Sequence, residues 1–230
     1  MTSPATAVRK PLDTIVVTTG DTIEYSVIWL HGLGASGHDF EPIVPELKLL
    51  KRPGVRFLFP HAPVRPISIN GGAAMRGWYD ITSLDFDQRE QDEEGTCDSA
   101  EQISDLIERE IDSGIAASNI ILAGFSQGGA IALYTALTSK HKLGGVMALS
   151  TYLPLPNQAL ANAAKTKGLP IFMAHGQYDE TINIAYAERS LQALRDAGFG
   201  VEWHTYPIPH SVSSEEVNDI ADWLKRLFGM

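Results

Sequence analysis

The sequence predicts a single α/β domain, with a mostly parallel central sheet that helices flank on both faces. Short continuous apolar runs, typical of strands covered on both faces, alternate with segments of helical period along most of the chain. No stretch rich in Pro, Gly and Ser divides it, and 230 residues, 44% of them hydrophobic, suffice for one sizeable core. We therefore expect one domain over residues 12–230, preceded by a flexible N-terminal tail at residues 1–11.

Six apolar segments are predicted to be strands because they are short and continuous. They are residues 24–30, 55–60, 119–123, 145–150, 169–174 and 201–206. Five segments between them have helical spacing and are predicted to be helices. They are residues 39–50, 97–115, 129–139, 184–197 and 213–228. In the last of these, Ser213 and Glu216 have the spacing of a capping box.

Residues 61–96 lack a clear period and are long for a connection in a compact domain. Their aromatic residues argue against disorder, so we expect an ordered excursion over one end of the sheet. The acidic run Gln91-Asp92-Glu93-Glu94 near its end is predicted to form a solvated turn.

Charge and cysteine content exclude several classes of protein. The chain carries 28 acidic and 18 basic residues, and its net charge of −10 disfavours binding to nucleic acid or to anionic lipid. One cysteine, Cys97, permits no intrachain disulfide and suits a reducing compartment. Because no apolar segment follows the basic residues of the N-terminus, no signal peptide is predicted and we expect a cytoplasmic protein.

Residues 113–139 contain no charged side chain and are long enough to cross a membrane as a helix. Three glycines and two polar residues in their middle favour two buried elements joined by a turn instead. We therefore expect no stable membrane insertion.

That turn, Gly124-Phe125-Ser126-Gln127-Gly128, matches the G-x-S-x-G pattern of a nucleophile elbow and lies between a predicted strand and a predicted helix. In such a turn the serine hydroxyl is exposed at the carboxyl end of the strand. Ser126 is therefore the candidate nucleophile, and the backbone N–H of Gln127 is a candidate donor to an oxyanion. The alternative is a glycine-rich turn with an incidental serine.

A serine nucleophile needs a histidine base and a carboxylate that orients it. His210 and Asp179 follow the last two predicted strands, so both lie at the carboxyl edge of a parallel sheet, where Ser126 also lies. His141, His175 and His204 are less suitably placed, and His175 is interpreted as a packed residue at a strand end. The alternatives are that Asp179 is a helix N-cap and that His210 is a surface histidine.

The first long strand ends in His31-Gly32-Leu33-Gly34. A glycine there permits close backbone approach, so the N–H of Leu33 is the candidate second oxyanion donor, and its side chain could form the floor of an acyl pocket. The alternative is a plain glycine turn. No metal site is predicted, since neither H-E-x-x-H nor C-x-x-C occurs, and no phosphate loop is present.

Several blocks in order resemble the acyl-protein thioesterase/carboxylesterase family, of the phospholipase/carboxylesterase type, from about Ile23 to Leu227. They are Trp29 to Gly34, Pro60 to Pro63, Asn70 to Gly72, Met75, Trp78 to Asp80, Gly124 to Gly129, His175-Gly176, Asp179, and Pro209 to Ser211. The stretch Asp39 to Pro45 resembles the bacterial carboxylesterase branch. The resemblance implies an α/β-hydrolase fold without a large cap domain, and no cofactor.

By motif, the resemblance assigns Ser126 as nucleophile, Asp179 as orienting acid and His210 as base. It assigns the oxyanion N–H groups to Leu33 and Gln127. It also implies an acyl groove that includes Leu33, Met75 and Trp78. Where relatives often carry Val-Pro after the acid, this chain has Thr181-Ile182-Asn183, which we expect to soften the loop without affecting the three residues.

The leading hypothesis is a cytoplasmic serine esterase that hydrolyses carboxylic esters of short to medium acyl chains through an acyl-enzyme on Ser126. The same residues would also serve an acyl-protein thioesterase or a lysophospholipase. A more remote alternative is a binding module without catalysis on a hydrolase fold. The expected partner is a small acyl ester or thioester, and an apolar groove mouth would favour a weak homodimer.

Overall fold

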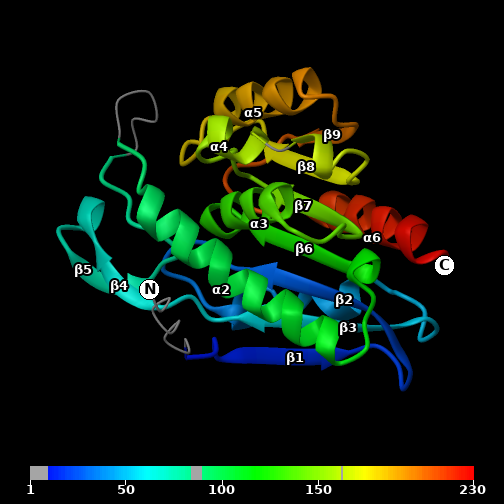
Figure 1. Ribbon diagram of the computed structural model, residues 1–230. Helices are drawn as coiled ribbons and strands as arrows, with labels where there is room; N and C mark the ends of the chain where they lie inside the picture. The colour runs from blue at the N-terminus through cyan, green and yellow to red at the C-terminus, as the bar shows by residue number, and fades with distance from the viewer. Residues whose placement is uncertain (1–9, 84–89, 162) are drawn as a thin grey trace, which may run out of the picture.

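The central feature of the fold is a seven-stranded sheet between two layers of helices (Figure 1). The computed structural model describes residues 10–83, 90–161 and 163–230. The strand order is β1-β3-β2-β6-β7-β8-β9, and every pair is parallel except β1 with β3. These strands are β1 (Thr14–Thr18), β2 (Ile23–Leu30), β3 (Gly54–Pro60), β6 (Ile120–Phe125), β7 (Gly145–Leu149), β8 (Ile171–Gly176) and β9 (Val201–Tyr206).

Helices cover both faces of this sheet. One buried cluster joins the sheet to α2 (Glu93–Asp112), α3 (Gln127–Thr138), α4 (Pro156–Leu160) and α5 (Ile184–Asp196). The other joins it to α1 (Ile43–Glu46) and α6 (Ser214–Phe228). Single turns of 3-10 helix lie at Gly37–Asp39, Ser68–Asn70, Ala117–Asn119 and Ala163–Lys165. This arrangement confirms the predicted α/β class.

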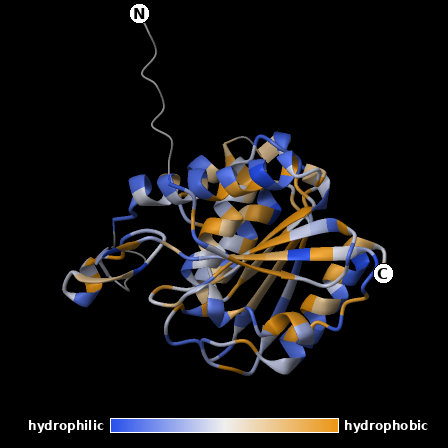
Figure 2. Cartoon of the chain, turned by 90° about the horizontal axis from the view of Figure 1, so that it is seen from below, coloured by the Kyte–Doolittle hydropathy of each residue, from blue (hydrophilic) through white to orange (hydrophobic). Residues whose placement is uncertain are grey.

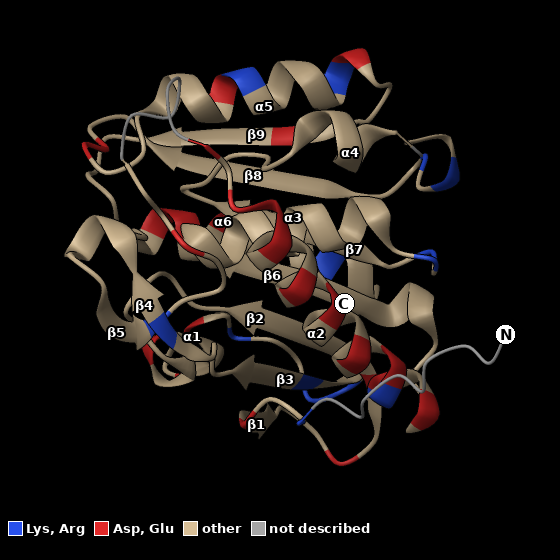
Figure 3. Cartoon of the chain, turned by 60° about the vertical axis from the view of Figure 1, so that its left-hand side comes forward, with Lys and Arg blue, Asp and Glu red and all other residues tan. Residues whose placement is uncertain are grey.

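Polar and apolar residues separate as this architecture requires. Figure 2 shows apolar residues along the strands, between the helix layers. Figure 3 shows the charged residues mainly on helices and loops, and the sequences of β6, β7 and β8 contain none. The charge-free residues 113–139 contain β6 and α3 at the centre of the fold, as expected. Among the helices of the described residues, none has both the length and the apolarity needed to cross a membrane.

The six predicted strands are confirmed within a few residues, but one predicted helix was wrong. Of residues 39–50, only Ile43–Glu46 form an α-helix. Pro42 and Pro45 lie inside the segment, and a proline removes a backbone donor and fixes its own φ, so the apolar spacing cannot build a long helix. The edge strand β1 was missed because it is partly exposed and its apolar run, Ile15 to Val17, is only three residues long.

The excursion at residues 61–96 is ordered where the structure describes it, while residues 84–89 lie outside the described part. It contains a hairpin, β4 (Val64–Ile67) with β5 (Ala73–Arg76), which was not predicted. Its acidic end is not a solvated turn. Asp92 is the N-cap of α2, accepting from the N–H of Gly95 at 2.8 Å and from that of Asp80 at 2.7 Å, so the helix starts at Glu93.

Half of the predicted capping box at α6 forms. The hydroxyl of Ser213 accepts from the N–H of Glu216 at 3.1 Å, but the Glu216 carboxyl is fully buried, and neither of its oxygens has a hydrogen-bond partner within the described residues. Burial, with a smaller contribution from the neighbouring Asp219 carboxylate, raises the pKa of Glu216 to about 8. The folded protein therefore holds a proton on Glu216 that the unfolded chain releases near pH 4.5.

This difference predicts that Glu216 lowers stability as the pH rises. Between about pH 5 and 8 the folded state binds one proton more than the unfolded state, so the free energy of unfolding falls by up to about 1.4 kcal/mol per pH unit. Glu216→Gln removes this contribution, and its advantage over the wild type should grow from pH 5 to 8 in urea unfolding. Glu215→Gln, at the exposed neighbouring position, is the control. A constant difference across this range would contradict the assignment.

Candidate active site

The candidate site begins at the sharp turn from β6 into α3. Ser126 lies at its apex with φ 55° and ψ −123°, a strained backbone conformation for a residue with a side chain. Its N–H donates to the Leu149 carbonyl at 2.9 Å, and its own carbonyl accepts from the Thr151 hydroxyl at 2.7 Å. These bonds to the neighbouring strand end hold the strained residue in place.

Two glycines make this turn possible. A Cβ on Gly124 would lie 2.3 Å from the carbonyl oxygen of Gly128. A Cβ on Gly128 would lie 2.4 Å from the carbonyl oxygen of His31. No side chain fits at either position, so the glycines of the motif allow the start of α3 to press against the end of β2. The G-x-S-x-G pattern is therefore a steric requirement of this turn.

Asp179 and His210 come together at the same edge of the sheet. The Nδ1 of His210 lies 2.6 Å from Oδ2 of Asp179, whose side chain is fully buried. The other carboxylate oxygen accepts from the N–H groups of Thr181, at 2.9 Å, and Ile182, at 2.8 Å. Burial opposes ionisation of Asp179, but donors including His175, His210 and the Ile182 N–H outweigh it and hold its pKa below the usual range.

The two alternatives for these residues do not fit the structure. Asn183, rather than Asp179, is the N-cap of α5, accepting from the N–H of Ala185 at 3.0 Å. The side chain of His210 is only 18% exposed, and its ring packs against Phe125 with centroids 4.6 Å apart. The segment Thr181-Ile182-Asn183, which stands in place of Val-Pro, is anchored at both ends. The N–H groups of Thr181 and Ile182 donate to Asp179, and Asn183 caps α5.

The backbone N–H groups of Leu33 and Gln127 are placed by a network that sequence reasoning did not predict. Gln127 starts α3, where N–H groups lack intrahelical acceptors. Its side chain accepts from the Trp78 N–H at 2.8 Å and donates to the Tyr79 carbonyl at 2.7 Å. The indole of Trp78 donates to the His31 carbonyl at 2.9 Å. Trp78 thus ties the start of α3 to the loop that carries Leu33.

His31 holds the loop from the other side. Its Nε2 accepts from the N–H of Ala62 at 3.0 Å, so Nδ1 carries the proton and donates to the Gly32 carbonyl at 2.7 Å. Burial, the largest cause, lowers the pKa of His31. The N–H of Gly34 donates to the Arg76 carbonyl on β5 at 2.8 Å. A neutral His31 and the Arg76 carbonyl therefore fix the backbone on the two sides of Leu33.

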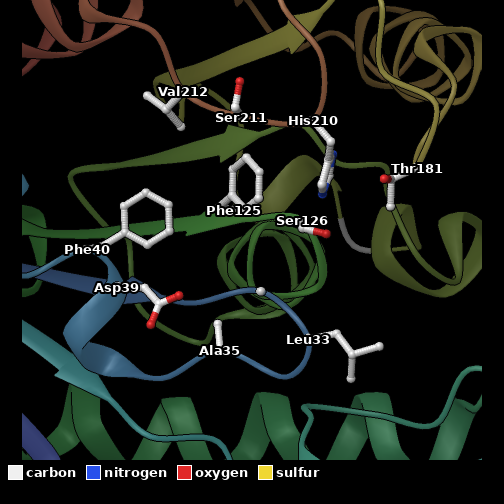
Figure 4. Close-up of a pocket in the computed structure, with 11 residues that line it drawn as sticks. Leu33, Ala35, Asp39, Phe40, Phe125, Ser126, Thr181, His210, Ser211 and Val212 are labelled. Atoms are coloured by element: carbon white, nitrogen blue, oxygen red, sulfur yellow. The ribbon is translucent and has the colours of Figure 1, made fainter. Parts of the chain in front are cut away.

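A cavity of about 450 Å³ joins these parts. In Figure 4 the imidazole of His210 points toward Ser126, and Leu33 lies on the opposite side of the opening. The remaining lining residues were not predicted, and only Asp39 among them carries a formal charge; they are Gly32, Ala35, Asp39, Phe40, Phe125, Thr181, Ser211 and Val212. The cavity is therefore mostly apolar around the serine and the histidine.

Met75 and Trp78, predicted for the acyl groove, do not line this cavity. Trp78 is fully buried and serves the network described above. Met75 is half-buried on β5, where its sulfur accepts from the side-chain amide of Asn70 at 3.3 Å. The structure thus brings Ser126, His210 and Leu33 to one cavity, with Asp179 behind His210. No cluster of three or more potential metal ligands occurs in the described parts of the chain.

Comparison with known proteins identifies the family. A family model described as phospholipase/carboxylesterase matches residues 13–228. Acyl-protein thioesterase 1 of Neurospora crassa is 42% identical over 208 residues, covering 86% of this chain and 85% of the relative. The protein of the same name from Cryptococcus neoformans is 39% identical over 216 residues, covering 86% and 90%. These matches confirm the resemblance stated from the sequence.

Solved structures superpose closely. SOBER1 of Arabidopsis thaliana has a TM-score of 0.83 at 32% identity, covering 88% of this chain and 98% of its own. Acyl-protein thioesterase 2 of Zea mays has a TM-score of 0.84 at 27% identity, covering 94% and 99%. The chain belongs to the phospholipase/carboxylesterase family of α/β-hydrolases and is an enzyme of the serine hydrolase class.

Proposed function

We propose that this enzyme hydrolyses carboxylic esters through an acyl-enzyme on Ser126. The observation that carries the proposal is that Ser126 and His210 line one cavity, while Asp179 accepts a hydrogen bond from the imidazole nitrogen on the far side. A serine, a histidine and a buried ionised carboxylate in this order form the machinery of acyl transfer. Asp179 then fixes the tautomer of His210, so that Nε2 is free to accept the serine proton.

The reaction follows from the positions of these groups. Oγ of Ser126 attacks the carbonyl carbon while Nε2 of His210 takes the hydroxyl proton. The N–H groups of Leu33 and Gln127 donate to the developing oxyanion. The tetrahedral intermediate collapses, and His210 gives its proton to the departing alcohol or thiol. Water, activated by His210, then releases the carboxylic acid from Ser126.

The size and lining of the cavity favour substrates with short to medium acyl chains. Its volume of about 450 Å³ lies toward the lower end for small-molecule pockets, and it has to accept part of the leaving group as well. Leu33, Phe40, Phe125 and Val212 provide apolar surface for an acyl chain. The groove role of Met75 and Trp78 stays a prediction, with Trp78 better suited to holding the oxyanion donors.

A second candidate, an acyl-protein thioesterase, is favoured by the names of the relatives. The same residues cleave a thioester, since the thiol is the leaving group in place of the alcohol. A lysophospholipase is less well supported, because the Asp39 carboxylate in the cavity repels a phosphate. A non-catalytic binding module would not require the low pKa of Asp179. Cytoplasmic location, one domain over residues 12–230 and a weak homodimer stay predictions.

The nucleophile is tested by Ser126→Ala. Loss of the attacking oxygen should lower kcat on p-nitrophenyl butyrate by roughly 10⁴–10⁶-fold and abolish labelling by a fluorophosphonate probe. The matched control is Ser211→Ala, since Ser211 lines the same cavity. This variant should keep the label. Near-wild-type turnover by the Ser126 variant would exclude Ser126 as the nucleophile.

The acyl-chain preference is tested with matched esters and thioesters of four, eight and sixteen carbons. Each buried CH₂ adds about 0.8 kcal/mol of binding until the cavity is filled. We therefore expect kcat/KM to reach its maximum at eight carbons or fewer, for both the oxygen ester and the thioester. A maximum at sixteen carbons would instead support a long-chain depalmitoylating enzyme.

Asp39 is predicted to discriminate against anionic leaving groups. Asp39→Asn removes the charge but keeps the oxygen that accepts from the Ser36 N–H at 3.2 Å. The kcat/KM for octanoyl-CoA should rise about two- to fivefold at low salt, while that for p-nitrophenyl octanoate stays constant. Glu41→Gln, which removes a nearby charge outside the cavity, is the control. Equal changes for both substrates would contradict this prediction.

A further inference from the structure

His175, interpreted from the sequence as a packed residue at a strand end, makes contacts that packing does not explain. It is the penultimate residue of β8, and its side chain is fully buried. Its Nε2 lies 2.8 Å from the carbonyl oxygen of Ile182 and 3.3 Å from Oδ2 of Asp179. This is the same carboxylate oxygen that His210 contacts.

These contacts fix the proton on His175. Both neighbours of Nε2 are oxygens that can only accept, because the Asp179 carboxylate is ionised, so Nε2 must carry a hydrogen. Nδ1 is buried and has no hydrogen-bond partner within the described residues. A second proton on Nδ1 would be buried without an acceptor, so the geometry favours a neutral ring with its one N–H shared between the Ile182 carbonyl and Asp179.

We propose that His175 is a positioning residue for catalysis, which acts on His210 through Asp179. With His175, each carboxylate oxygen has two nitrogen neighbours: His210 and His175 at Oδ2, and the N–H groups of Thr181 and Ile182 at Oδ1. The imidazole of His175 also donates to the Ile182 carbonyl, which holds the loop after β8 next to the carboxylate. Asp179 is thus held at one orientation toward His210.

The donor on Oδ2 also sets how strongly Asp179 attracts the His210 proton. Because two donors share one carboxylate oxygen, that oxygen is a weaker acceptor for each of them than it would be for one donor alone. Without the His175 N–H, the carboxylate would bind the His210 proton more tightly and could also rotate. The imidazole would then stay protonated to a higher pH and would be less well aligned with Ser126. A side chain that only filled space would produce neither effect.

Two variants separate donation from packing. His175→Gln can place an amide N–H near the position of Nε2, whereas His175→Met fills similar space without a donor. His204→Met is the control, because His204 lies on the adjacent strand β9, stacks on Phe172 and contacts Glu202 and Asp219 rather than Asp179. Thermal unfolding shows whether each variant is folded before its activity is compared.

The inference rests on the proposed function, so activity is measured together with a readout that does not need turnover. For His175→Met we expect kcat on p-nitrophenyl butyrate to fall roughly 10–100-fold with little change in KM, and the acid limb of kcat/KM to move to higher pH. His175→Gln should recover most of both. The proton NMR resonance of the His210 Nδ1–H should move downfield in His175→Met only.

Two results would overturn the role of His175. One is an unchanged acid limb and an unchanged Nδ1–H resonance in a folded His175→Met protein. The other is equal loss of kcat in the Gln and Met variants without any movement of the resonance, which indicates packing alone. Fluorophosphonate labelling of Ser126 in the wild type distinguishes these outcomes from failure of the proposed function, because it tests the nucleophile in the protein whose His175 is intact.

Discussion

The close approach of two backbones, at the start of α3 and the end of β2, is the constraint on which the site depends. Gly128 lies so near the carbonyls of Leu30 and His31 that no side chain fits between them. This contact places the N–H of Gln127 beside the loop that carries Leu33. It also forces Ser126 into its strained conformation, with its hydroxyl toward the cavity. A bulkier residue at position 128 would move α3 away from β2. This would displace Ser126 and the Gln127 N–H from the loop that carries Leu33.

Two separate networks then orient the remaining groups. Trp78 and the Gln127 side chain, together with His31, hold the two candidate oxyanion donors. His175 and the loop after β8 hold Asp179 against His210. The first network is built from the excursion after β3, and the second from the carboxyl ends of β8 and β9. The parallel sheet brings them together, since the ends of its central strands meet at one edge.

The sequence predicted the parts of this protein that are set by local pattern. Buried strands appear as continuous apolar runs. Ser126, Asp179 and His210 each follow a strand of the parallel sheet, β6, β8 and β9, so their places at its carboxyl edge could be predicted from the chain order. The helix at residues 39–50 was predicted wrongly because apolar spacing was weighed above Pro42 and Pro45. The contacts of Trp78 could not be predicted, because they join segments that lie far apart in the sequence. The contacts of His175 and the place of Asp39 in the cavity depend on loop conformations, which the sequence pattern does not specify.

One end of the sheet has a consequence for association between chains. Among the described residues β9 pairs with β8 alone, so its other side offers backbone groups that an extended segment could pair with. The strand carries Glu202, which is bound by Arg226 of α6 at 2.7 Å and contacts His204 at 3.1 Å. A strand added from another molecule would desolvate this cluster of charged and polar groups. This border is therefore less open to sheet extension by another chain.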